Sequence, residues 1–141
     1  MESPTSTLKV FVYGTLKPGE INYRRCCDRK VQSATLAYTK GILYSLPVGY
    51  PAMTEGENKV TGFVLTFSDS DILNTLDRLE DYQAQRAADL NEYYRRLVTV
   101  YNLDDEPIDK AWAYFMTLDK VKQYRGTIIT SGCWNSNNLS I

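Results

Sequence analysis

The stretch from Leu8 to Tyr13 constrains the fold of this chain more than any other part of the sequence. Apart from Lys9, its residues are apolar or β-branched, and such a run is typical of a buried strand. The run ends at Gly14, and the turn residues Pro18 and Gly19 follow soon after. Because glycine lacks a Cβ, a ligand can approach the main chain there, and the N–H groups of the loop are available as donors. The segment predicts either a core strand with its exit turn or a strand that ends at a ligand site.

Length and charge predict a single soluble domain that spans residues 1–141. A chain of 141 residues can bury a substantial core without metals or disulfides. Its formal net charge of −1 favours neither nucleic-acid nor membrane-surface partners. No apolar run approaches the roughly 20 residues that span a bilayer, and the first residues do not resemble a secretory signal. We therefore expect a cytoplasmic protein without nucleic-acid or membrane partners, and the sequence does not define its oligomeric state.

The sequence contains no histidine, which excludes Ser-His and Cys-His catalytic pairs and histidine-bearing metal sites. Its cysteines, Cys26, Cys27 and Cys133, form no CxxC pair, so neither a zinc site nor a disulfide framework is indicated. We interpret them as structural thiols, of which Cys133 could be exposed. Acid–base chemistry must then rest on carboxylates, tyrosines or lysines, and we expect no metal or cofactor.

Hydrophobic periodicity predicts an α+β protein built on a mostly non-local sheet or barrel. Alternating or apolar runs indicate strands at residues 31–38, 41–46, 60–67, 93–101 and 110–116. Residues 41–67 are expected to form a hairpin, with a turn at 55–58. Between the strands lies one amphipathic helix, which Ser68 or Asp69 can cap. Its apolar residues recur at helical spacing at Ile72, Leu73, Leu76 and Leu79.

Glu80, near the end of this helix, is the candidate acid–base residue. Leu76 and Leu79 define the buried face, and Glu80 is expected at its border. Partial burial would raise the pKa of this carboxylate from about 4.3 towards the neutral range that a general base needs. Asp77, three residues earlier, could share that site or cap the helix. The alternative is that Glu80 is a solvated charge near a helix end.

Tyr93 and Arg95 share one face of the strand that follows. A tyrosine and an arginine on one face could place a hydroxyl beside a carboxylate and hold a substrate charge. They could equally form an ordinary surface ladder.

In order and spacing, these segments resemble the γ-glutamylcyclotransferase-like family, in particular its small γ-glutamylamine cyclotransferase-like (AIG2-like) branch. The resemblance covers nearly the whole chain. It rests on Val10–Leu16 with Lys17-Pro18-Gly19, Leu76–Glu80, Tyr93–Arg95 leading into Val98–Val100, Ala111–Tyr114, and Ile129–Trp134. The last of these is similar to the family's terminal Ser-Gly-x-Trp.

The resemblance implies a small mixed β-barrel with flanking helices and a cavity at one end. It implies a substrate site lined by Tyr13, Gly14, Thr15 and Leu16. It also implies that Glu80 is the acid–base residue and that Tyr93 and Arg95, which match the family's Tyr-x-Arg, shape the pocket. Because residues 81–92 form a rather long polar stretch, no relative's substrate preference can be transferred.

The reaction implied by the resemblance is an intramolecular aminolysis of a γ-glutamyl amide. The α-amine attacks its own γ-carbonyl, giving 5-oxoproline and a free amine or amino acid, so the enzyme is an amide-cleaving acyltransferase or lyase. Glu80 would act as general base and then as general acid. Three alternatives stay open: a non-catalytic small-ligand binding module of the same fold, a related enzyme acting on another acyl-amine in a biosynthetic pathway, and an interaction protein that uses the basic cluster Arg24–Lys30.

Overall fold

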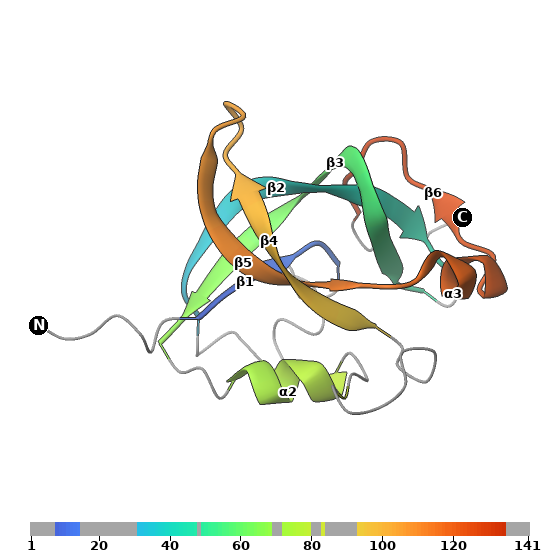
Figure 1. Cartoon of the computed structure of the whole chain (residues 1–141), viewed down its shortest axis with the longest axis horizontal. Helices are drawn as coiled ribbons and strands as arrows, with labels where there is room; N and C mark the ends of the chain where they lie inside the picture. The colour runs from blue at the N-terminus through green and yellow to red at the C-terminus, as the bar shows by residue number, and fades with distance from the viewer. Residues whose placement is uncertain are drawn as a thin grey trace, which may run out of the picture.

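The structure is a computed structural model, and it describes residues 8–14, 31–47, 49–68, 72–79, 83 and 93–134. Six strands and two helices are defined in these residues (Figure 1). In chain order they are β1 (Leu8–Val12), β2 (Val31–Ser45), β3 (Pro51–Phe67), α2 (Ile72–Leu79), β4 (Tyr94–Tyr101), β5 (Pro107–Phe115), α3 (Leu118–Gln123) and β6 (Thr127–Ile128). Neither of these helices is long and apolar enough to cross a membrane.

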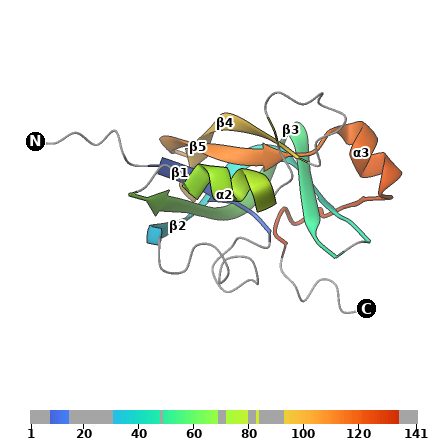
Figure 2. The same cartoon turned by 90° about the horizontal axis from the view of Figure 1, so that it is seen from below.

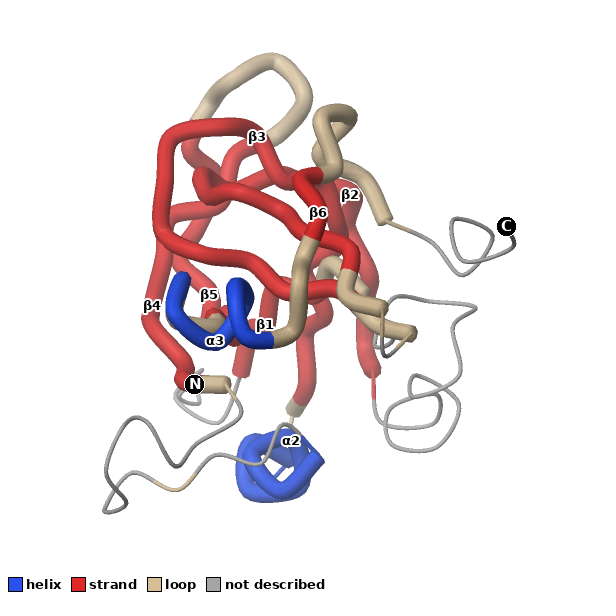
Figure 3. Tube along the Cα trace, turned by 90° about the vertical axis from the view of Figure 1, so that its right-hand side faces the viewer, coloured by secondary structure: helices blue, strands red, loops and turns tan. Residues whose placement is uncertain are grey.

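The strands form one mixed sheet whose pairings close into a ring. Their order is β3-β1-β5-β4-β2-β6, and β2 also pairs with β3, so β6 is the only one of these strands outside the ring. The β1–β5 pair is parallel and the others are antiparallel. Figure 3 shows the strands wrapping around one another, with α2 outside the ring. The predicted α+β fold, a small mixed sheet with flanking helices, is confirmed.

Strands β2 and β3 form one long hairpin that turns a corner. The register jumps between Gly41 and Ile42, where β3 carries the extra residues 55–57. Glycine allows the two strands to approach at this corner, because a Cβ at Gly56 would lie only 2.5 Å from Cγ1 of Ile42. The prediction of a turn at 55–58 is therefore wrong: these polar residues belong to a bulge that bends a continuous strand.

Period-two alternation divides the buried side chains between two clusters. The interior cluster draws on all five strands of the ring and comprises Phe11, Tyr13, Ala37, Leu43, Met53, Val60, Val64, Val100, Ala111, Ala113, Phe115 and Trp134. The helix-side cluster faces α2 and α3 and comprises Leu8, Val10, Val12, Tyr44, Leu46, Ala52, Leu65, Phe67, Ile72, Leu76, Tyr93, Tyr114, Met116 and Val121. Both faces of the ring are therefore packed, as the apolar run at the start of the chain predicts.

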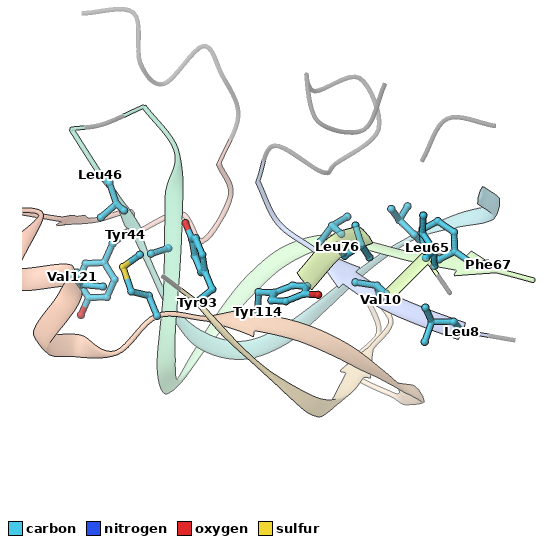
Figure 4. Close-up of a cluster of buried hydrophobic side chains, with 14 residues drawn as sticks. Leu8, Val10, Tyr44, Leu46, Leu65, Phe67, Leu76, Tyr93, Tyr114 and Val121 are labelled. Carbon is cyan, nitrogen blue, oxygen red and sulfur yellow. The ribbon is translucent and has the colours of Figure 1, made fainter. Parts of the chain in front are cut away.

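Helix α2 lies across β1 and β5 on the helix side (Figure 2). The predicted helical spacing is confirmed, since Ile72 and Leu76 are 3% and 1% exposed. Burying two such side chains contributes about 1.5–3 kcal/mol each. In Figure 4, Leu76 lies close to Val10 and to the ring of Tyr114. The helix is thus seated directly over the strand that leads to Gly14.

Candidate active site

The end of β1 brings Gly14 against the start of β3. Strand β1 ends at Val12, and both Tyr13 and Gly14 are buried. A Cβ at Gly14 would lie 2.6 Å from Cγ of Pro51. Because that atom belongs to a rigid ring, the neighbour cannot simply rotate away, and glycine is the residue that fits. The space beside the Gly14 Cα is thus taken by Pro51, and the approach of a ligand to this part of the main chain stays a prediction.

Tyr93 contacts the same proline. Its hydroxyl donates a buried hydrogen bond to the carbonyl oxygen of Pro51 at 2.7 Å, and its side chain is 6% exposed. The rings of Tyr50 and Tyr93 lie 6.4 Å apart. The start of β3 is therefore held between the end of β1 and the start of β4.

Asp77 is the residue that ties α2 to the sheet. Its Oδ1 accepts hydrogen bonds from Nε of Arg95 at 2.9 Å and from the hydroxyl of Tyr114 at 2.6 Å. The Asp77 and Arg95 side chains are only 15% and 21% exposed. The guanidinium of Arg95 also lies 4.7 Å from the centre of the Trp112 ring, in the geometry of a cation–π contact. Charge-assisted hydrogen bonds of this kind fix the helix against β4 and β5.

Tyr114 contacts both halves of the predicted site. Its side chain reaches Asp77 on α2, while its backbone carbonyl accepts a buried 2.7 Å hydrogen bond from the hydroxyl of Tyr13. Sequence reasoning did not identify Tyr114 as a functional residue. The signal that could have found it is the pairing of β4 with β5, which sets Tyr114 directly opposite Arg95.

The predicted site residues that the structure describes gather at one end of the sheet: Tyr13, Gly14, Tyr93 and Arg95. Others lie outside the described residues: Thr15, Leu16 and Glu80. Glu80 directly follows Leu79, the last residue of α2. Of the cysteines, Cys133 is exposed, whereas Cys26 and Cys27 are outside the described part of the chain. In that part, no three or more Cys, Asp or Glu side chains are grouped so that they could hold a metal ion.

The opposite face of β4 carries a second arginine, carboxylate and tyrosine. Nη1 of Arg96 lies 2.7 Å from Oε1 of Glu55, and the Tyr94 hydroxyl donates to Oε2 of Glu55 at 2.8 Å. The Arg96 and Glu55 side chains are 49% and 58% exposed. The Tyr94 ring stacks on Phe115, with 5.8 Å between ring centres. Burial, together with the hydrogen bond to Glu55, raises the pKa of Tyr94 to about 12.

A hollow of about 270 Å³ lies beside this second group. Its lining includes Lys40, Glu55, Arg96 and Phe115, and it includes none of the predicted site residues that the structure describes. The hollow is therefore distinct from the region where Gly14 and Tyr93 contact Pro51 and where Arg95 contacts α2.

Comparisons with known families and solved structures identify relatives of this chain. A family model described as gamma-glutamyl cyclotransferase, AIG2-like, matches residues 10–136. No curated protein matches the chain significantly. Among solved structures, YkqA from Bacillus subtilis aligns with a TM-score of 0.63 and 27% identity over 91% of this chain. This chain spans only 39% of YkqA.

Two further solved structures are similar in fold. An AIG2-like protein from Mus musculus aligns with a TM-score of 0.64 and 20% identity, over 91% of this chain and 88% of that chain. A protein described as gamma-glutamyl cyclotransferase aligns with a TM-score of 0.52 and 20% identity, over 79% of this chain and 67% of that chain. The family match extends over nearly the whole sequence and includes every predicted site residue. This chain belongs to the gamma-glutamyl cyclotransferase, AIG2-like family.

Proposed function

We propose that this chain is a single-domain cytoplasmic enzyme that converts a γ-glutamyl amide into 5-oxoproline and a free amine or amino acid. Membership of the gamma-glutamyl cyclotransferase, AIG2-like family supports this class of reaction. The observation that carries the proposal is the convergence on Tyr114. That residue contacts Tyr13, which precedes Gly14, and Asp77, which lies on the helix that leads to Glu80.

In the proposed reaction the nucleophile and the electrophile belong to one substrate molecule. The α-nitrogen forms a bond to the γ-carbon, and the bond from that carbon to the leaving nitrogen then breaks. No covalent enzyme intermediate is needed, because the enzyme has only to hold the glutamyl chain bent in a near-attack conformation. A site bounded by packed strands and an anchored helix suits that task, since small displacements of the reacting atoms are costly.

Glu80 is proposed to move the proton that this reaction must transfer. Its carboxylate takes one proton from the α-ammonium of the substrate and releases it to solvent, so that the neutral amine can attack. It then takes a second proton from the attacking nitrogen and delivers it to the leaving nitrogen. A single carboxylate can perform both steps, so the chemistry requires no metal or cofactor.

The negative charge that develops on the γ-carbonyl oxygen needs hydrogen-bond donors. We propose the backbone N–H groups of Gly14, Thr15 and Leu16 for this role, with about 3 kcal/mol for each well-placed donor. The tight packing of Gly14 against Pro51 supports this assignment, because it restrains the backbone just after β1.

Tyr93 and Arg95 are proposed to shape the pocket rather than to react. The Tyr93 hydroxyl is bonded to the Pro51 carbonyl and thereby holds the start of β3. Arg95 holds α2 through Asp77.

The test is turnover of a panel of γ-glutamyl amino acids and γ-glutamylamines, with 5-oxoproline measured by mass spectrometry. We expect product from one of these classes and a loss of at least about 10²-fold in kcat for Glu80→Gln. Glu55→Gln is the matched control, because Glu55 lies in the exposed group on the other face of β4. Product formation by Glu80→Gln at the wild-type rate would remove this residue from the mechanism. Binding of a panel member without product would instead favour a binding module of the same fold.

A further inference from the structure

We infer that Tyr114 is a positioning residue of this site, since its side chain and its backbone connect the two segments proposed to be catalytic. The side chain holds α2, which leads to Glu80, and the backbone carbonyl holds Tyr13, which leads to Gly14. This inference rests on the proposed function and adds to it a residue that does not touch the reacting atoms.

The contacts of Tyr114 are of a kind that fixes position. Its side chain is 3% exposed, and the 2.6 Å bond from its hydroxyl to Asp77 has the length of a strong bond to a carboxylate. Figure 4 shows Tyr114 lying between Tyr93 on one side and Leu76 on the other. The ring therefore packs in the helix-side cluster while its hydroxyl reaches α2.

The second contact of Tyr114 does not depend on its side chain. The backbone carbonyl accepts the Tyr13 hydroxyl at 2.7 Å, so this bond survives replacement of Tyr114 by phenylalanine. Tyr114→Phe consequently breaks the bond to Asp77 on the helix and keeps the bond to Tyr13, whereas Tyr13→Phe breaks the bond that ties β1 to Tyr114 and keeps the bond to Asp77. The two links can be cut one at a time by removing single oxygen atoms.

Helix α2 needs this anchor because it is short. The helix spans Ile72–Leu79, and its apolar contacts through Ile72 and Leu76 select its buried face, but such contacts are non-directional and define its rotation less sharply than hydrogen bonds do. Directional bonds to Asp77, in the last turn before Glu80, set that rotation. A displacement of about 1 Å at a reacting group can cost about 10²-fold in rate.

The experiment compares Tyr114→Phe with Tyr94→Phe. Both changes remove one phenol that donates to a carboxylate, but Tyr94 bonds to Glu55 on the other face of β4. We expect kcat of Tyr114→Phe to fall by about 10- to 100-fold with KM within about twofold of wild type. The acidic limb of its kcat/KM profile, which would report the proposed base, should shift, while Tyr94→Phe keeps both the rate and the profile. A folded Tyr114→Phe with wild-type kcat and profile would overturn the inference.

A double variant tests whether the effect passes through Asp77. If Tyr114 acts through this side chain, Asp77→Ala, which removes the acceptor, with Tyr114→Phe should lose no more activity than Asp77→Ala alone. Losses that multiply would mean that Tyr114 acts elsewhere, and would overturn the inference.

Amide hydrogen exchange of α2 gives a readout that needs no substrate. We expect faster exchange in Thr75–Leu79 for Tyr114→Phe and wild-type exchange for Tyr94→Phe. If the wild-type protein forms no 5-oxoproline from any panel member, the proposed function fails. The exchange data alone then decide whether Tyr114 holds α2 in place. Unchanged exchange in Tyr114→Phe would then overturn it.

Discussion

The two faces of β4 carry the same chemical groups in different surroundings. On the helix side, Arg95 pairs with Asp77, and the hydroxyl of Tyr114 donates to the same carboxylate. On the other side, Arg96 pairs with Glu55, to which Tyr94 also donates. The side chains of the first ion pair are 21% and 15% exposed, and those of the second are 49% and 58% exposed.

This difference decides what each group can contribute. A largely buried pair binds strongly and directionally, but it leaves an unpaired charge in a poorly solvated place when one partner is removed. An exposed pair competes with water and contributes little. Neighbouring arginines in one strand thus have different roles, because alternate side chains of a strand point to opposite faces.

Replacing each arginine in turn should give the largest difference between the two faces of β4. Arg95→Met should lower the free energy of unfolding by about 2–3 kcal/mol, because Asp77 loses its cation in a site with little access to water. Arg96→Met should lower it by less than about 1 kcal/mol. Urea denaturation at neutral pH measures both. Equal losses would contradict the contrast between the two faces.

The titration of Tyr94 probes the exposed group further. Its pKa is raised to about 12, chiefly by burial and then by the hydrogen bond to Glu55. The difference between the spectra of wild type and Tyr94→Phe isolates the phenolate absorbance of Tyr94. This absorbance should therefore appear near pH 12. Glu55→Gln should lower this pKa only part of the way towards its ordinary value, because burial remains.

The raised pKa of Tyr94 also makes the stability of the protein depend on pH. A group whose pKa is higher in the folded protein stabilises it fully below the ordinary value of about 10, and this stabilisation is lost as the pH rises through about 12. Wild type should therefore lose stability relative to Tyr94→Phe as the pH rises from about 10 to about 12, and the difference between them should stay constant above that range. A Tyr94 titration near its ordinary value would be evidence against burial of this ring.

The effect of salt on the coupling energies of the two ion pairs is the smallest of the differences that we expect. At 1 M salt the screening length is about 3 Å, so the coupling energy between Arg96 and Glu55 in a double-mutant cycle should fall by a few tenths of a kcal/mol towards zero. The coupling between Arg95 and Asp77 should keep most of its value, because little solvent reaches that pair. Equal salt dependence of the two cycles would argue that both pairs are exposed in solution.

The sequence predicts well those features that depend on local periodicity. Alternation along 60–67 sends Val60 and Val64 to the interior cluster and Leu65 and Phe67 to the helix-side cluster, and the helical spacing of Ile72 and Leu76 identifies α2. Such patterns require only that each element bury one face or both.

Features that depend on distant partners were not predictable in the same way. The polar stretch at 55–58 has the composition of a turn, and only its pairing with β2 makes it a bulge. The sequence places Tyr93 and Arg95 on one face, but it does not indicate that the hydroxyl beside the carboxylate would come from Tyr114, which lies 37 residues after Asp77. Likewise, the close neighbour of Gly14 is Pro51, from a different strand.

The most direct test of the account follows the α-nitrogen of the substrate. A γ-glutamyl substrate with an isotope-labelled α-nitrogen is incubated with the enzyme in oxygen-labelled water, beside Glu80→Gln and Glu55→Gln. Internal aminolysis predicts 5-oxoproline that keeps the nitrogen label and takes no oxygen from water, formed by wild type and Glu55→Gln and lost in Glu80→Gln. Glutamate carrying oxygen from water, or labelled 5-oxoproline formed equally fast by Glu80→Gln, would contradict it.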